Sequence, residues 1–189
     1  ATVLAQKVKS QTGLRTNLYL VSVADTSAGK DHGRKCLKLA FHAAGLESML
    51  GGEDLASGPG LLAAAKRNPR SVFQIDEFGL MLKSIKGNNA GAHLQQIITN
   101  LMKLFTSTSS TFTGTEYANQ SVRPRADIPY PCVNVHATTT PEPLFEAFGS
   151  GDVASGNLNR LLILFAPTSR FPLRFTEVRE PPAKVVEWM

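Results

Sequence analysis

The residues of this chain best suited to hold a phosphate lie between positions 24 and 32. Small side chains there let consecutive backbone N–H groups turn toward phosphate oxygens, and a lysine after them supplies a mobile cation for the same anion. The stretch consists of Ala24, Asp25, Thr26, Ser27, Ala28 and Gly29, followed by Lys30, Asp31 and His32. This pattern predicts a nucleotide-binding loop.

Two positions of the loop depart from the pattern G-x-x-x-x-G-K-[ST]. Ala24 replaces the first glycine, which is tolerable where that position keeps a negative φ. Asp31 replaces the final hydroxyl residue and brings a carboxylate close to the phosphates. Because carboxylates bind Mg²⁺, Asp31 is a candidate metal ligand. The alternative is that Asp31 is only a favourable acid in the first turn of a helix.

A pair of acids, Asp76 and Glu77, follows the apolar run "VFQI". Enzymes with a phosphate loop place an acid at the end of a neighbouring strand, where it holds the magnesium shell, and a following glutamate can polarise the attacking water. We therefore expect Asp76 to be a metal ligand and Glu77 a catalytic base. The alternative is an ordinary strand end with two exposed acids.

Two further candidates follow in the chain. The run "VNVHATTTP" turns polar at its end, where Thr138 or Thr139 fits a polar sensor beside the terminal phosphate. These threonines could instead make turn hydrogen bonds before a helix that begins at Pro141. Arg160 precedes the last apolar run, "LLILF", and is a candidate catalytic arginine or else a solvated or salt-bridged one.

Basic residues suggest a weaker, DNA-binding role. Cations in a polar segment can follow the phosphate backbone of a nucleic acid. The candidates are Arg123 and Arg125, in the polar stretch 107–130, and Lys83 and Lys86, after the acid pair. The alternative for all four is a solvent-exposed surface. The two cysteines and four histidines show no metal-ligand spacing.

Alternating apolar and amphipathic segments must position these residues. Apolar runs predict strands at 17–24, 71–79, 131–140 and 159–167, and helices are predicted at 30–46, 60–68, 90–105 and 141–149. The region 47–59 leaves room for one weak strand, and 107–121 for a hairpin around Gly114. This alternation predicts an α/β fold of three layers, with a mainly parallel central sheet flanked by helices. We expect a lead-in at 1–16, a core at 17–167 and a surface extension at 168–189.

The composition fits a single packed domain. The chain has 189 residues, of which 42% are hydrophobic and 19% charged, with a net charge of +5. These values exclude a disordered chain, and no run approaches the ~20 apolar residues of a membrane span. The two cysteines are far apart in sequence and are typical of reduced thiols or buried small hydrophobes, so we expect a cytoplasmic protein. The mild positive charge is compatible with a polyanionic partner without requiring one.

Four stretches, "ADTSAGKD", "VFQIDEFG", "VNVHATTTPE" and "GNLNRLLI", occur in this order within residues 15–166. The set resembles the P-loop ATPase domain of phage and prophage replication proteins, which are helicase-like domains of the AAA+ and superfamily 3 group. The resemblance implies a P-loop core with ATP and Mg²⁺ as cofactors. It makes Lys30 the Walker A lysine, Asp76 the Walker B acid and Glu77 the catalytic base.

The same resemblance implies partners. It makes Arg160 an arginine finger that acts in trans, within a homo-oligomer such as a hexameric ring. Single-stranded DNA and a primase or other replication protein are the implied partners, and the cytoplasm of a bacterial host is the implied location. A helical lid with a second sensor arginine is not evident in the sequence.

The first hypothesis for the function is a Mg²⁺-dependent ATPase motor that moves DNA during replication, as a helicase or translocase. Two alternatives stay open. One is a DNA-packaging motor ATPase, which has a similar core. The other is a nucleotide-binding assembly module that hydrolyses little or no ATP, for which Asp31 is the supporting residue.

Overall fold

Four parallel strands form the centre of the protein. The computed structural model describes residues 1–189 except 6, 88–89, 123, 150–155 and 167–179. The strands of the sheet, in their order across it, are β2 (Arg70–Ile75), β5 (Cys132–Thr139), β1 (Tyr19–Val23) and β6 (Leu161–Phe165). All three pairings are parallel. Because β1 pairs with β5 and not with β2, the strand that carries the acids is not the direct neighbour of the strand before the loop.

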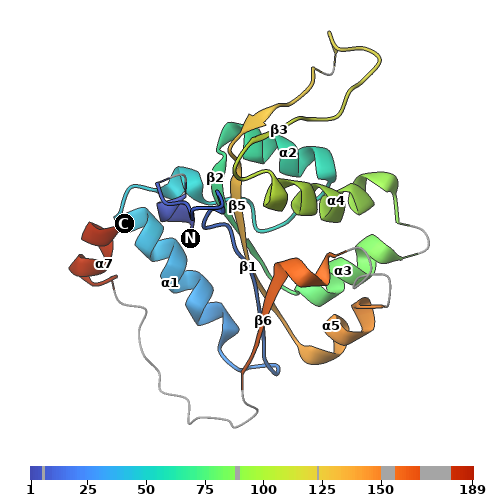
Figure 1. Ribbon diagram of the computed structural model, residues 1–189. Helices are drawn as coiled ribbons and strands as arrows, with labels where there is room; N and C mark the ends of the chain where they lie inside the picture. The colour runs from blue at the N-terminus through green and yellow to red at the C-terminus, as the bar shows by residue number, and fades with distance from the viewer. Residues whose placement is uncertain (6, 88–89, 123, 150–155, 167–179) are drawn as a thin grey trace.

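Helices cover both faces of this sheet (Figure 1). One face carries α1 (Lys30–Ala43), and the other carries α2 (Gly58–Arg67), α3 (Phe78–Lys86), α4 (Ala92–Thr106) and α5 (Pro141–Ala147). Short 3₁₀ helices lie at η1 (Thr2–Leu4), η2 (Glu47–Met49) and η3 (Leu158–Arg160). The predicted three-layer α/β fold is therefore confirmed, and the eight predicted strands and helices all occur, with shifted ends.

The helix ends follow from local chemistry. Ser57 caps α2, because its side-chain oxygen accepts a hydrogen bond from the Gly60 N–H at 3.1 Å. Pro141 opens α5, where a missing N–H costs nothing. The predicted helix 30–46 stops earlier, at Ala43, and Gly45 then takes a φ of +66° that only glycine adopts without strain.

The predicted strand 71–79 was wrong at its end. The strand β2 ends at Ile75, and the acid pair lies between it and α3, a helix that was not predicted. The apolar residues Phe78, Leu82 and Ile85 recur at helical spacing and are buried. This stripe is the sequence signal for α3, and it places Glu77 at the start of a helix.

The predicted hairpin at 107–121 was wrong in its extent. The strands β3 (Thr111–Phe112) and β4 (Ile128–Pro129) pair antiparallel, so the loop between them runs from 113 to 127. Gly114 lies beside the returning chain, and its N–H donates to Asp127 Oδ1 at 3.0 Å. The predicted weak strand within 47–59 is reduced to a single bridge between Leu50 and Val72.

Part of the predicted surface extension is helical. Residues Ala183–Trp188 form α7, which packs against α1. Residues 168–179 of the same extension lie outside the described residues. None of the helices in the described ranges is long and apolar enough to cross a membrane.

The two faces of the sheet differ in chemistry. Val21, Phe73 and Val135 belong to a large apolar core with α2, α3, α4 and α5, and we call this side the core face. The alternate residues point toward α1, and we call that side the α1 face. There the second apolar cluster is small and consists of Phe41, Met49 and Val72, with a few half-buried neighbours. The α1 face also carries polar side chains, among them Gln74, Asn134 and His136.

Candidate functional site

The predicted loop lies at the carboxyl edge of the sheet. It joins the end of β1 to the start of α1, next to the ends of β5 and β2. From β1 the chain first builds β2 and β5 on one side, and it then returns to place β6 on the other. The carboxyl end of β1 is therefore the switch point of the sheet, the place where open α/β folds bind ligands.

The backbone of the loop is shaped for an anion. Ser27 and Gly29 have φ of 64° and 80°, whereas Ala24 keeps a negative φ, as the sequence required. Gly29 is the N-cap of α1. Within the described part of the chain, the N–H groups of Gly29, Lys30 and Asp31 donate to no backbone acceptor. These groups and the positive end of a 14-residue helix can together hold a phosphate.

The Lys30 ammonium lies between two strand ends. Its Nζ donates to the carbonyl oxygens of Ala24, at 2.9 Å, and Thr139, at 3.3 Å. It has no carboxylate partner among the described residues. The charge of Lys30 is therefore not neutralised by an acid, as binding of an anionic ligand requires.

Asp76 and Thr138 are brought together at the ends of β2 and β5. The Thr138 hydroxyl donates to Asp76 Oδ1 at 2.7 Å, and the Glu77 N–H donates to the same oxygen at 3.0 Å. Burial alone would raise the pKa of Asp76. These hydrogen bonds and the charge of Arg34 outweigh burial and lower the pKa below its usual value. Asp76 is therefore a carboxylate at neutral pH.

The two candidate threonines have different surroundings. The Thr139 hydroxyl accepts from the Gly79 N–H at 3.1 Å and donates to the Thr140 carbonyl at 3.2 Å, so it fastens α3 to β5. Only the backbone carbonyl of Thr139 reaches Lys30. Thr138 is thus the threonine whose side chain shares the site with Asp76.

Arg34 is a site residue that the sequence prediction missed. It lies one turn after Lys30 on α1 and is 8% exposed. Its Nη1 contacts Asp76 Oδ2 at 2.7 Å and Asp31 Oδ1 at 3.3 Å, and its Nη2 contacts Glu53 Oε2 at 3.0 Å. The i, i+4 spacing from Lys30 was the available signal, because residues four apart share one side of a helix.

Asp31 and His32 point along α1 and not into the loop. The Asp31 side chain is 68% exposed and pairs with Arg34. One guanidinium nitrogen contacts both Asp31 Oδ1 and Asp76 Oδ2, so these oxygens are at most 6.0 Å apart. The His32 ring lies 3.4 Å from the Cys36 sulfur, one turn further on. Of His32, only the backbone lies near the phosphate loop.

Glu77 holds an unusual backbone conformation. Its φ of 46° and ψ of 44° are left-handed, which costs a residue with a side chain about 1 kcal/mol or more. Its carboxylate has no ion-pair or hydrogen-bond partner in the part of the chain that is described. A strained turn that presents a free carboxylate beside Asp76 is compatible with a catalytic base.

Arg160 lies at the opposite edge of the sheet. It ends η3, directly before the first residue of β6, and its Nη1 donates to the Gly156 carbonyl at 2.6 Å. A strand of five residues separates the two edges by about 16 Å. Arg160 therefore does not reach the Lys30 edge of its own chain.

The candidate DNA-binding residues that are described already have protein partners. Lys83 pairs with Glu146 at 2.5 Å, and Lys86 donates to the Ala147 carbonyl at 2.7 Å, so both link α3 to α5. Arg125 pairs with Glu116 and Asp127 in the exposed loop after β3. Arg123 lies outside the described residues. DNA binding by these residues stays a prediction.

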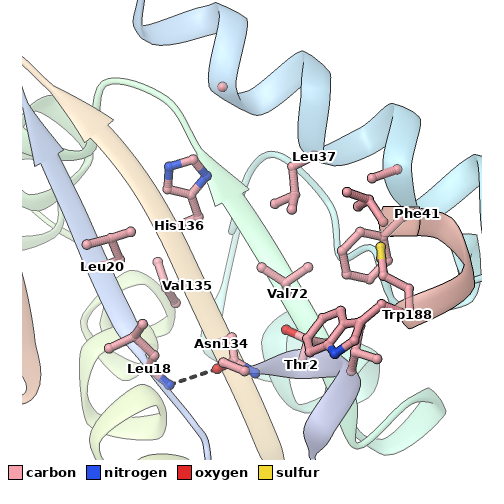
Figure 2. A pocket seen from close by; sticks show the side chains of 16 residues that line it. Thr2, Leu18, Leu20, Leu37, Phe41, Val72, Asn134, Val135, His136 and Trp188 are labelled. Carbon is pink, nitrogen blue, oxygen red and sulfur yellow. Dashed lines mark hydrogen bonds between the residues drawn. The ribbon is translucent and has the colours of Figure 1, made fainter. Parts of the chain in front are cut away.

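A cavity lies between α1 and the α1 face of the sheet. It measures about 450 Å³, and Figure 2 shows Leu37 and Phe41 of α1 across from Val72 and His136 of the sheet. Trp188 of α7 lies at one end (Figure 2). The lining is mostly apolar, and the cavity leaves open space between α1 and the sheet.

His136 is a polar side chain of this wall, two residues after Asn134 on β5. It pairs in register with Gln74 on β2 and Leu20 on β1. Its Nδ1 is buried and has no hydrogen-bond partner among the described residues. Burial and, secondarily, the charge of Arg34 lower the pKa of His136. The imidazole is therefore neutral at neutral pH.

The described side chains offer no ready-made metal cage, since no three His, Cys, Asp or Glu residues converge as ligands. Magnesium that arrives with a nucleotide needs only one or two carboxylates beside the phosphates and water, which Asp76 fits. Comparison with known proteins gave no matching family model and no matching curated relative.

Proposed function

We propose that this chain is a Mg²⁺-dependent ATPase domain that acts as a helicase or translocase motor in DNA replication. The observation that carries the proposal is the position of Lys30. Its ammonium lies at the carboxyl edge of the sheet, where its partners among the described residues are the carbonyls of Ala24 and Thr139, and the bonded pair of Asp76 and Thr138 lies at the same edge. That combination suits a polyphosphate and its metal.

Each residue then has a role that its surroundings support. The loop amides and Lys30 would hold the phosphates, and Asp76, which stays ionised, would be a ligand for Mg²⁺. Bound Mg²⁺ would neutralise charge on the phosphates. Glu77 accepts a proton from the attacking water, and Thr138 orients Asp76 through its 2.7 Å hydrogen bond.

The role in DNA replication and the oligomer rest on the sequence resemblance. Arg160 is remote from the site of its own chain, so a catalytic role for it requires a second copy. Removal of an arginine finger lowers turnover by ~10³-fold or more. Arg160→Ala should therefore abolish hydrolysis and keep nucleotide binding. Full activity of this variant would exclude the finger.

One observation favours the assembly module as a second candidate. The Asp76 carboxylate already accepts from Thr138, the Glu77 amide and Arg34, so its capacity for a metal is reduced. A protein of this kind would bind ATP and change its assembly state without turnover.

An ATPase assay decides between the two candidates. The purified 189-residue chain is assayed with and without single-stranded DNA, beside Lys30→Ala and Glu77→Gln. The motor predicts activity that DNA stimulates and that both substitutions abolish. ATP binding without turnover, unchanged by DNA, would establish the assembly module instead.

A further inference from the structure

Arg34 is buried among three carboxylates from three parts of the chain. Its guanidinium contacts Asp31 on α1, Glu53 in the segment after η2, and Asp76 at the end of β2. Its Nε is buried without a hydrogen-bond partner in the described ranges. A guanidinium taken this far out of water persists only where several acceptors compensate for the lost hydration.

We propose that Arg34 is a built-in counter-cation that positions Asp76 and keeps divalent cations out of this acid cluster until a nucleotide is bound. The metal part of this inference rests on the proposed function, whereas the exclusion of cations from the free protein does not.

The charges support this role. Asp31, Glu53 and Asp76 contribute three negative charges, and Arg34 is the cation that contacts all three. Lys38 also pairs with Glu53, but it has no contact with Asp76 in the described structure. Without Arg34 the cluster would keep three carboxylates and one peripheral lysine, and this excess of negative charge attracts cations.

The geometry also explains how a metal could reach Asp76 beside Arg34. Arg34 contacts Oδ2, whereas Thr138 and the Glu77 amide hold Oδ1. The Gln74 amide donates to the Arg34 backbone carbonyl at 3.3 Å and ties this turn of α1 to β2. A nucleotide on the loop adds phosphate ligands, so a metal then needs only one free lone pair of Asp76.

The test compares Arg34→Gln with Lys38→Gln. Both variants remove one positive charge from α1 and one partner of Glu53, but only the first frees Asp76. Binding of Mn²⁺ to the nucleotide-free chain is measured by electron paramagnetic resonance. We expect Arg34→Gln to bind Mn²⁺ about tenfold more tightly than the wild type, and Lys38→Gln to change the affinity far less. Equal Mn²⁺ affinities of the two variants would overturn the inference.

A second measurement titrates Mg²⁺ against binding of a fluorescent ATP analogue. Arg34→Gln should shift the Mg²⁺ midpoint to lower concentration, and Arg34→Lys should shift it less because it keeps the charge. A midpoint that stays unchanged in both Arg34 variants would also overturn the inference. If Arg34→Gln loses its near-ultraviolet circular dichroism, the variant has lost its tertiary packing, and Arg34→Lys is then compared with the wild type instead. Failure of the wild type to bind the analogue would refute the proposed function, while the Mn²⁺ comparison still decides the role of Arg34.

Discussion

The two faces of the central sheet differ in their packing and chemistry. On the core face, alternate residues of β1, β2 and β5 pack with four helices into one large apolar cluster. On the α1 face, the same strands present Gln74, His136 and Thr138 toward a single long helix, with a cavity of about 450 Å³ between them. Stability should therefore depend on the core face and ligand binding on the α1 face.

Substitution of one leucine on each side tests this division most strongly. Leu104 of α4 is fully buried, so Leu104→Ala should lower the free energy of unfolding by about 3 kcal/mol. Leu37 of α1 is half-buried and already lines the cavity, so Leu37→Ala should cost about 1 kcal/mol. Urea denaturation followed by circular dichroism measures both. Equal losses would contradict the division.

Two glycines give a second comparison. A Cβ on Gly79 would lie 2.7 Å from backbone atoms of Pro143 and Leu144, so Gly79→Ala should lower the free energy of unfolding by about 2 kcal/mol. Gly29 has open space around it but a φ of +80°, so Gly29→Ala should cost only about 1 kcal/mol. Gly29→Ala should instead weaken binding of an ATP analogue. If Gly29→Ala binds normally, the left-handed turn is not needed for the ligand.

The neutral His136, on the α1 face, predicts that the free energy of unfolding depends on pH. Its folded pKa is lowered, so the unfolded chain takes up the proton first as the pH falls below about 6.5. The contribution of His136 to the free energy of unfolding is fully present above that pH and is lost as the pH falls further. Between pH 7 and 5 the wild type should lose more stability than His136→Gln, by less than about 1 kcal/mol because the ring is partly solvated. Urea denaturation at each pH measures this loss. An equal loss of stability in the two proteins between pH 7 and 5 would contradict this assignment.

Asp31→Thr should have the smallest effect. The Asp31 side chain is mostly exposed and Arg34 keeps two other carboxylate partners, so the free energy of unfolding should change by less than about 0.5 kcal/mol. Nucleotide affinity should stay the same or improve, because a negative charge beside the phosphates is removed. A clear loss of affinity, measured with the same ATP analogue, would show that the carboxylate is a metal ligand after all.

The sequence predicted the elements of the fold because apolar runs and helical stripes report burial directly. The helix α3 was not predicted because the acid pair was assigned to the end of a long strand, although Phe78, Leu82 and Ile85 already had helical spacing. The pairing of β3 with β4 was not predicted because two strands separated by fifteen residues leave no local signal in the sequence.

The site was predicted in part. Lys30, which donates to the Thr139 carbonyl, and the bonded pair of Asp76 and Thr138 lie at the same edge of the sheet, because parallel strands end there. Arg34 was missed, since its spacing from Lys30 indicates a shared side of the helix but does not show that Glu53 and Asp76 will lie against it. In β5 the alternation of Val133, Asn134, Val135 and His136 distinguishes a polar from an apolar face, but it was interpreted only as a buried strand.

Binding of ATP to the wild type and to Lys30→Ala, measured by isothermal titration calorimetry in the presence of Mg²⁺, tests the central claim most directly. We predict that the wild type binds and that Lys30→Ala loses at least about tenfold in affinity, roughly the 1.4 kcal/mol expected for one charged contact, with an unchanged unfolding curve. No binding by the wild type, or equal binding by both proteins, would contradict it.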